Sequence, residues 1–229
     1  MPIKAVVFDL DGTLASFNID YRTVRAEVKS LLTSEGIPPS LLSVKESIFE
    51  MLKKTEIFLR NNNKPQKIME EISKKALAIA EKYELEAAKN TKLLPRVSET
   101  LKALKKMDLK IGLCTINGEK SVNYILQRFK IAEFFNAVIP RNKVKLVKPH
   151  AEHLEATLNA LEVKRDEAIA VGDGTGDMRS AKELKVVAVG LPTGVSSPKE
   201  LTGSGANYII TSIADLPTLI EQINETHEK

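Results

Sequence analysis

Two aspartates near the start of the chain, Asp9 and Asp11, stand two residues apart in the turn sequence DLDGT. They follow the apolar run Ala5–Phe8, which is typical of a buried parallel strand, so both carboxylates fall at the strand's C-terminal end. Residues two apart in extended backbone point to the same side, until the turn at Gly12 redirects the chain. Two carboxylates held there repel each other unless a cation joins them. The expected cation is a hard one with oxygen ligands, such as Mg²⁺.

Two further polar clusters, each expected where a strand ends, hold groups that could bind an anion. Thr115 and Asn117 come after the apolar run Ile111–Cys114 and before a predicted helix, where a hydroxyl and backbone N–H groups make an anion site. The same residues are also ordinary at a helix N-terminus. Lys148 follows the run Val144–Val147 and precedes another predicted helix. By itself it is one surface lysine among many.

A glycine-rich acidic turn follows the apolar run Ala168–Val171. It carries Asp173 and Asp177 in the sequence GDGTGD, and such a turn can approach a metal closely. An EF-hand is excluded because the twelve-residue loop with its final glutamate is absent. A dinucleotide-binding turn is excluded because the glycine spacing differs and the acids would face phosphate. The alternative is a helix N-cap, but the company of the other clusters favours a metal site.

The elements that must position these residues alternate between strands and helices. Short apolar runs bounded by turn residues predict strands, and amphipathic patterns between most of them predict helices. This alternation predicts an α/β fold, a Rossmann-like parallel sheet sandwiched by helices. The predicted strands are Ala5–Phe8, Ile111–Cys114, Ala137–Ile139, Ala168–Val171, Val186–Val189 and Tyr208–Ile210.

A long stretch between the first two predicted strands carries helical patterns and no convincing strand. It predicts an all-helical insert from Phe17 to Lys92, which leaves residues 1–16 and 93–229 as the α/β catalytic core. Because the insert begins just beyond Asp9 and Asp11, we expect it to act as a lid over them. The alternative is a helical layer without a gating role. The apolar stripes of the insert are Val24, Val28, Leu31 and Leu32; Ile48, Met51, Leu52 and Leu59; and Ile68, Ile72, Ile79 and Tyr83.

Composition and charge argue against several classes of protein. The chain has 229 residues, 43% of them hydrophobic, and a net charge of +4. The charges are interspersed without a long basic run, which argues against a nucleic-acid partner. No apolar stretch approaches the length that spans a bilayer. The N-terminus lacks a secretion signal and there is a single cysteine, so we expect a cytoplasmic protein, as a monomer or small homo-oligomer.

Three other residues with reactive side chains are expected to be structural. Cys114 lies within an apolar run and is expected to be a packed core thiol. His150 and His153 stand three residues apart on a predicted helix. They could form a metal pair, but the sequence supplies no third ligand, so we expect both on the surface.

The ordered set of motifs resembles the haloacid dehalogenase superfamily. It comprises the turn with Asp9 and Asp11, then Thr115, the Lys148-Pro149 pair and the acidic turn Gly172–Asp177. The resemblance covers the whole chain, and its first and last motifs are the specific ones. Helices inserted just after the first motif are similar to the helical (C1-type) cap of phosphoglycolate phosphatase-like members. Those members often have Asp-Ser shortly after the first motif, where this chain has Ala-Ser.

The resemblance implies a role for each acid. Asp9 would be the nucleophile that attacks phosphorus and becomes an aspartyl-phosphate. Asp11 would be the general acid for the leaving group and then the general base for water. Mg²⁺ would be held by Asp9, the backbone carbonyl of Asp11 and Asp173. Asp177 would support the water shell of the metal or orient Lys148.

The same resemblance assigns Thr115 and Lys148 to the transferring phosphoryl group, with Asn117 near them. General chemistry agrees, because a phosphoryl transition state needs positioning and charge neutralisation more than covalent chemistry. A carboxylate can approach an anionic phosphate ester only if cations offset the repulsion. Mg²⁺ and Lys148 would supply that offset.

The implied activity is that of a Mg²⁺-dependent phosphatase acting on a small phosphorylated metabolite. The acid at Asp11 favours a phosphatase or a phosphomutase, because halide departure needs no proton and the related ATPases have threonine there. A phosphomutase similar to β-phosphoglucomutase is the main alternative. A phosphonatase would need a lysine of the insert that forms a Schiff base. A non-catalytic binding domain would be signalled by a missing nucleophile or acid, and a response-regulator receiver would lack the large insert.

Overall fold

The computed structural model describes residues 2–16 and 18–227. The chain divides into two compact units, one made of Met1–Asn18 and Asn90–Lys229 and the other of Ile19–Lys89. Phe17, the predicted first residue of the insert, lies outside the described residues. No described helix, including the 25-residue α3 (Gln66–Asn90), is long and apolar enough to cross a membrane.

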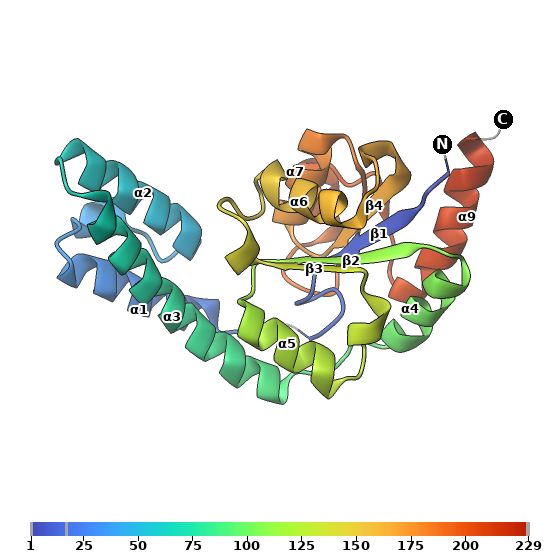
Figure 1. The fold of residues 1–229 in the computed structure, drawn as a ribbon, viewed down its shortest axis with the longest axis horizontal. Helices are drawn as coiled ribbons and strands as arrows, with labels where there is room; N and C mark the ends of the chain where they lie inside the picture. Colours follow the sequence, from blue (N-terminus) through green and yellow to red (C-terminus); the bar gives the residue numbers. More distant parts are fainter. Residues whose placement is uncertain (1, 17, 228–229) are drawn as a thin grey trace. The chain divides into compact units, whose positions relative to one another are not determined.

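The first unit is built on a parallel sheet that, in the described residues, has six strands in the order β3-β2-β1-β4-β5-β6 (Figure 1). All its neighbouring strands run parallel. The predicted α/β fold, a Rossmann-like sheet between helices with a helical insert, is confirmed. The strands are β1 (Ala5–Phe8), β2 (Lys110–Thr115), β3 (Ala137–Pro140), β4 (Ala168–Gly172), β5 (Val187–Gly190) and β6 (Tyr208–Ile209).

The predicted apolar runs match these strands to within one residue at each end. The run Val144–Val147 differs, because it forms no strand and belongs to the loop after the short 3₁₀ turn η3 (Arg141–Lys143). In this loop the backbone N–H groups of Lys145 and Leu146 donate to the carboxylate of Glu152, at 2.9 and 3.2 Å. These backbone N–H groups bond to a side chain, whereas in a strand they would bond to the carbonyl groups of a neighbouring strand.

Helices cover both faces of the sheet (Figure 1). α6 and α7 pack on one face, and α4 and α5 lie on the other, where α9 packs against α4. The helices of this unit are α4 (Val97–Lys106), α5 (Glu119–Arg128), α6 (Ala151–Leu161), α7 (Thr175–Leu184), α8 (Pro198–Ser204) and α9 (Leu216–His227). The remaining 3₁₀ turns are η2 (Ala132–Phe134), η4 (Arg165–Glu167) and η5 (Ile213–Asp215) in this unit, and η1 (Pro39–Leu41) in the other.

The central strand explains why the first apolar run is continuous. β1 lies between β2 and β4, and all four of its residues are buried. Ala5 and Val7 belong to the apolar cluster that includes residues of α6 and α7. Because a strand with helices on both faces has no solvent side, its sequence shows no polar alternation. The end of such a strand is therefore a sharp boundary between an apolar interior and polar chemistry.

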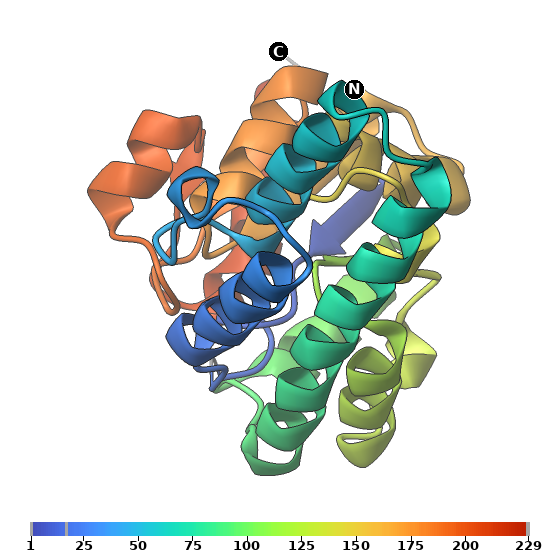
Figure 2. The same cartoon turned by 90° about the vertical axis from the view of Figure 1, so that its left-hand side faces the viewer.

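The second unit is helical, with an apolar core of its own. Its helices α1 (Tyr21–Ser34), α2 (Ile48–Asn61) and α3 contribute to one buried cluster, and Figure 2 shows them in blue to green. α2 begins with a capping box, in which Ser47 and Glu50 bond to each other's backbone N–H groups. Such a cap typically contributes about 1 kcal/mol to helix stability. The helical character predicted for this stretch agrees with these helices.

The buried stripe of α3 differs from the predicted one. Ile68, expected inside, is 37% exposed, whereas Met69, Ala76 and Ala80 are buried with the predicted Ile72. The apolar face therefore lies about one residue further along the chain at its start and continues through alanines. Alanine side chains are less hydrophobic than the neighbouring isoleucines, so the sequence pattern followed the isoleucines and predicted the wrong face of the helix.

The two chain segments that lead into and out of the helical unit are bonded to each other within the first unit. The backbone N–H of Ser16 donates to the carbonyl of Lys92 at 2.8 Å, and the hydroxyls of Ser16 and Thr91 lie 3.1 Å apart. Ala15 and Leu93 form an antiparallel bridge beside them. We call this pair of segments, residues 15–16 and 91–93, the neck.

Candidate active site

The predicted site residues meet at one edge of the sheet because their strands are neighbours. Asp9 follows β1, Thr115 is the last residue of β2, and Asp173 follows β4. β1 lies between the other two, so the three carboxyl ends come together. The backbone N–H of Asp9 donates to the carbonyl of Val171 at 2.9 Å, which continues the ladder beyond the strand. This bond fixes the main chain of Asp9 at the sheet edge.

Lys148 reaches the site from the loop between η3 and α6. Its Nζ donates to Oδ1 of Asp9 at 2.6 Å, to Oδ1 of Asp177 at 2.5 Å and to the carbonyl of Cys114 at 2.7 Å. The side chain is only 6% exposed. The interpretation of this lysine as one of many surface residues is therefore wrong, because three acceptors surround its ammonium group.

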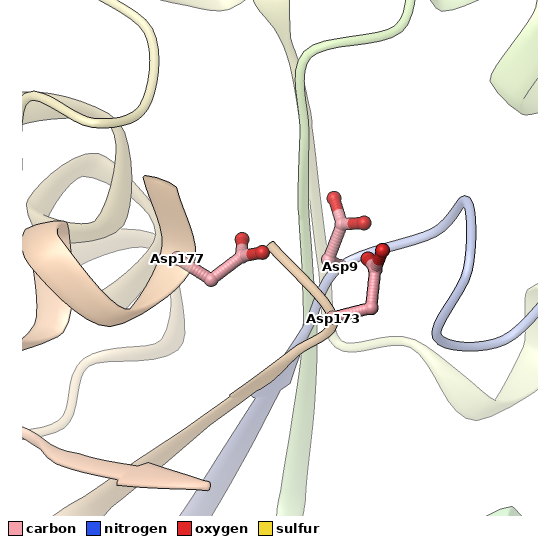
Figure 3. Close-up of side chains that lie close together, drawn as sticks. All are labelled: Asp9, Asp173 and Asp177. Carbon is pink, nitrogen blue, oxygen red and sulfur yellow. The ribbon is translucent and has the colours of Figure 1, made fainter. Parts of the chain in front are cut away.

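Three carboxylates face one another beside this lysine, as Figure 3 shows for Asp9, Asp173 and Asp177. Each offers an oxygen, and these oxygens lie within 4.8 Å of one another. Oδ2 of Asp177 also accepts the backbone N–H of Gly174 at 3.1 Å, in the first turn of α7. Clustered carboxylate oxygens are the donor set of a hard divalent cation. The residues present therefore fit Mg²⁺.

The electrostatics of the cluster point the same way. Burial raises the pKa of Asp9 to about 7; the Lys148 ammonium opposes this rise, and the charges of Asp177 and Asp173 add to it. Burial and then the charge of Asp177 raise the pKa of Asp173 to about 6. Burial alone would lower the pKa of Lys148, but Asp177 and Asp9 hold it well above its usual range. The cluster thus carries more negative charge than the lysine offsets, and a divalent cation would relieve it.

Asp11 occupies a different environment from Asp9. It is half-buried, and its Oδ2 accepts a hydrogen bond from Nδ2 of Asn117 at 2.7 Å. The backbone N–H of Asn117 donates to the hydroxyl of Thr115 at 3.2 Å. Oδ1 of Asn117 is buried and has no hydrogen-bond partner among the described residues, so it can accept one from a bound molecule. The structure therefore brings the side chain of Asn117 to the second carboxylate, and the hydroxyl of Thr115 is bonded to the main chain of Asn117.

A loop that was not predicted to belong to the site completes the surroundings of Asp173. It follows β5, the neighbour of β4, so it falls on the same edge of the sheet. Val195 donates its backbone N–H to Oδ2 of Asp173 at 2.9 Å, and the hydroxyl of Thr193 donates to the carbonyl of Gly12. A Cβ at Gly194 would overlap the Asp173 carboxylate. The sequence feature that could have identified this loop is its Thr-Gly pair, which lies just beyond the end of a predicted strand.

Comparison with known proteins places this arrangement in a family. The sequence model of the haloacid dehalogenase-like hydrolases matches residues 6–191, a span that contains every predicted site residue. The chain belongs to this family. The fold and the order of its motifs are those that the resemblance implied.

Relatives of this hydrolase match nearly its whole length. A phosphoglycolate phosphatase from Photorhabdus laumondii is 26% identical over 225 residues, which cover 95% of this chain and 92% of that protein. A pyrophosphatase PpaX from Bacillus cereus is 25% identical over 235 residues, covering 99% and 100% of the two chains. The crystal structure of a hydrolase from Pseudomonas syringae superposes with a TM-score of 0.67 at 25% identity, covering 96% of this chain and 99% of that one.

Two further residues of the hydrolase lie against the site. Cys114 is buried, and burial raises the pKa of its thiol to about 12, so the predicted core thiol is confirmed. His153, expected on the surface, is fully buried in α6. That expectation is wrong because α6 packs on β2 and β3, which turns this face of the helix inward. His150 is half-buried and immediately precedes the helix.

Proposed function

We propose that this hydrolase is a Mg²⁺-dependent phosphatase of a small phosphorylated metabolite and that Asp9 carries the phosphoryl group during turnover. The observation that carries the proposal is the placement of Asp9. One of its oxygens meets the ammonium group of Lys148 at 2.6 Å, and the carboxylates of Asp173 and Asp177 stand beside it. A second acid, Asp11, follows two residues later. The relatives named as phosphatase and pyrophosphatase support phosphorus chemistry.

The two acids divide the reaction between them. Asp9 attacks phosphorus, and the bond to the ester oxygen breaks while Asp11 gives that oxygen its proton. Asp11 then takes a proton from water, the water oxygen attacks phosphorus, and Asp9 departs as a carboxylate. Splitting one displacement into two easier ones is the advantage of a covalent intermediate. The separate environments of Asp9 and Asp11 suit these unlike roles.

Charge neutralisation falls to the cationic groups. Lys148 would exchange part of its contact with Asp9 and Asp177 for the phosphoryl oxygens. The Thr115 hydroxyl and the Asn117 side chain would orient the same group. Mg²⁺, held by Asp9, Asp173 and the backbone carbonyl of Asp11 with support from Asp177, would supply the positive charge that lets a carboxylate meet a phosphate.

We further propose that the helical unit, residues 19–89, is the cap of this enzyme and sets its selectivity. The support is its position in the chain, since it starts a few residues beyond Asp11, and its separate apolar core. The core motifs are shared by enzymes with different substrates, so discrimination must come from other residues.

A phosphate-release screen over a panel of phosphorylated metabolites, with and without Mg²⁺, tests the proposal. The panel starts with 2-phosphoglycolate and pyrophosphate, because two relatives are named for them. We expect Mg²⁺-dependent release by the wild type and none by Asp9→Asn, whose circular dichroism should be unchanged. Turnover that persists in Asp9→Asn would reject Asp9 as nucleophile. Isomerised sugar phosphate without free phosphate would identify a phosphomutase.

A further inference from the structure

The buried His153 has both ring nitrogens engaged. Its Nε2 lies 2.9 Å from the carbonyl oxygen of Ile139, in β3, and its Nδ1 lies 3.4 Å from the backbone N of Lys148. A carbonyl oxygen only accepts, so Nε2 carries the hydrogen. In a neutral ring Nδ1 is then an acceptor, which suits the N–H of Lys148. The imidazole therefore joins the end of β3 to the main chain at Lys148.

The surroundings keep this ring neutral. Burial, and after it the charge of Lys148, lowers the pKa of His153 to about 4, while the hydrogen bond to Ile139 and then the charge of Glu152 have weaker opposite effects. Glu152, the preceding residue, accepts the N–H groups at positions 145 and 146. The first turn of α6 thus holds the same loop at two places, one of them directly at the lysine. Of the two side chains that hold the loop, Glu152 and His153, the ring of His153 is the buried one.

We propose that His153 is a positioning residue that fixes the main chain of Lys148 so that its ammonium group reaches Asp9. The inference rests on the proposed function, in which Lys148 neutralises the phosphoryl group. A lysine side chain is long and flexible, so its reach is defined only if its backbone is fixed. Displacing a catalytic group by about 1 Å can cost roughly 100-fold in rate. His153 needs no contact with the substrate to have this effect.

Three substitutions separate the two bonds of the ring. His153→Asn keeps an acceptor near the position of Nδ1, His153→Gln keeps a donor near that of Nε2, and His153→Leu keeps neither. We expect kcat to fall roughly 10- to 100-fold in the Leu and Gln variants and to be largely retained in the Asn variant. Inorganic phosphate, used as a competitive inhibitor, should likewise bind more weakly to the Leu and Gln variants than to the Asn variant.

A matched control separates positioning from packing. Thr157, one turn further along α6, is also fully buried, and its hydroxyl donates to the carbonyl of His153 at 3.0 Å. Thr157→Val removes a buried hydrogen bond from the same helix without touching Lys148. We expect it to lower the melting temperature while leaving kcat and phosphate inhibition near wild type. Loss of activity in proportion to loss of stability across all four variants would overturn the proposal.

Combining His153→Leu with Lys148→Ala gives the decisive readout. A residue that acts through the lysine has little further effect on kcat once the lysine side chain is gone, whereas an independent role adds its full loss. A full additional loss would overturn the proposal. If His153→Leu does not fold, the Asn and Gln variants decide, and equal activity in those two would overturn it. A wild type inactive on every phosphate ester would instead refute the proposed function.

Discussion

The carboxyl group of Asp9 holds its proton more tightly in the folded protein than in the unfolded chain. Its folded pKa is about 7 against an ordinary value of 3.8, with burial as the largest cause. Between these two values the unfolded chain has released the proton and the folded protein has kept it. The raised pKa of Asp9 therefore stabilises the folded, metal-free protein at low pH. This part of the free energy of unfolding is lost as pH rises from about 4 to about 7. In the proposed mechanism the charge of Asp9 is needed for catalysis, and the same charge opposes stability.

This linkage predicts how Asp9→Asn compares with the wild type. The amide cannot ionise, so in EDTA the variant should gain stability relative to the wild type as pH rises from about 4 to about 7. Thermal or denaturant unfolding of both proteins at several pH values measures the difference. The titration of His153 is common to both and cancels to first order. A difference independent of pH would contradict a raised pKa of Asp9 in the folded protein.

Asp11 and its partner Asn117 predict a dependence on the leaving group. Asp11→Asn should lower kcat/KM for an alkyl phosphate by roughly 10²–10⁴-fold, because the departing alkoxide then receives no proton. For p-nitrophenyl phosphate, whose leaving group is stable as an anion, the loss should be much smaller. Steady-state kinetics with the two esters provide the measurement. Equal losses for both would remove Asp11 from the role of general acid.

At the scale of elements, the loop after β5 should control metal affinity through Asp173. Gly194→Ala places a methyl group in the space of the Asp173 carboxylate, which must then shift. Changes in groups that orient a ligand typically weaken metal binding roughly 10- to 100-fold. We expect the Mg²⁺ concentration at half-maximal activity, and the dissociation constant from calorimetry, to rise by that factor.

Another glycine supplies the control for this substitution. Gly203 lies in α8, and a Cβ there would meet no atom within 4 Å. Gly203→Ala should leave Mg²⁺ affinity unchanged and slightly stabilise the helix, since alanine has the higher helix propensity. Equal Mg²⁺ affinities in the two variants would mean that the loop after β5 does not orient Asp173.

The elements also show why some site residues were predictable from sequence and others were not. Asp9 and Asp173 follow continuous apolar runs, and parallel strand ends converge on one edge whatever the details of packing. His153 gave no such signal, because its burial depends on how α6 packs on two strands. The contact of Gly194 with Asp173 is likewise a tertiary close approach between separate loops. A local sequence pattern indicates where a strand ends, but it does not indicate which side chains meet when separate elements pack together.

For the whole molecule, we expect the neck to make the helical unit removable. Its two segments are already bonded to each other by Ser16, Thr91 and Lys92. Replacing residues 19–89 with a short Gly-Ser linker should therefore leave the sheet folded and its carboxylate cluster in place. We expect the shortened protein to hydrolyse p-nitrophenyl phosphate and to discriminate poorly among metabolites.

Circular dichroism, Mg²⁺ titration and the phosphate-release panel would measure these properties. The full-length protein is the reference for selectivity, and the shortened chain carrying Asp9→Asn is the control for contaminating phosphatases. A shortened protein that is folded and equally selective would contradict the role of the helical unit as the cap. Such a result would leave the assignments of Asp9 and Asp11 intact.

The neck also bears on how such a protein can change over evolutionary time. Because its ends are joined, the sheet meets the whole insert as a single closed loop. The entropy of closing a flexible loop grows only with the logarithm of its length, by about 0.6 kcal/mol for each doubling. Insertions, deletions or wholesale replacement between Ser16 and Thr91 would cost the α/β unit little stability. Under the proposed role of the insert in selectivity, descendants of one hydrolase core can thus diverge in the metabolites they accept while the residues at the edge of the sheet stay as they are.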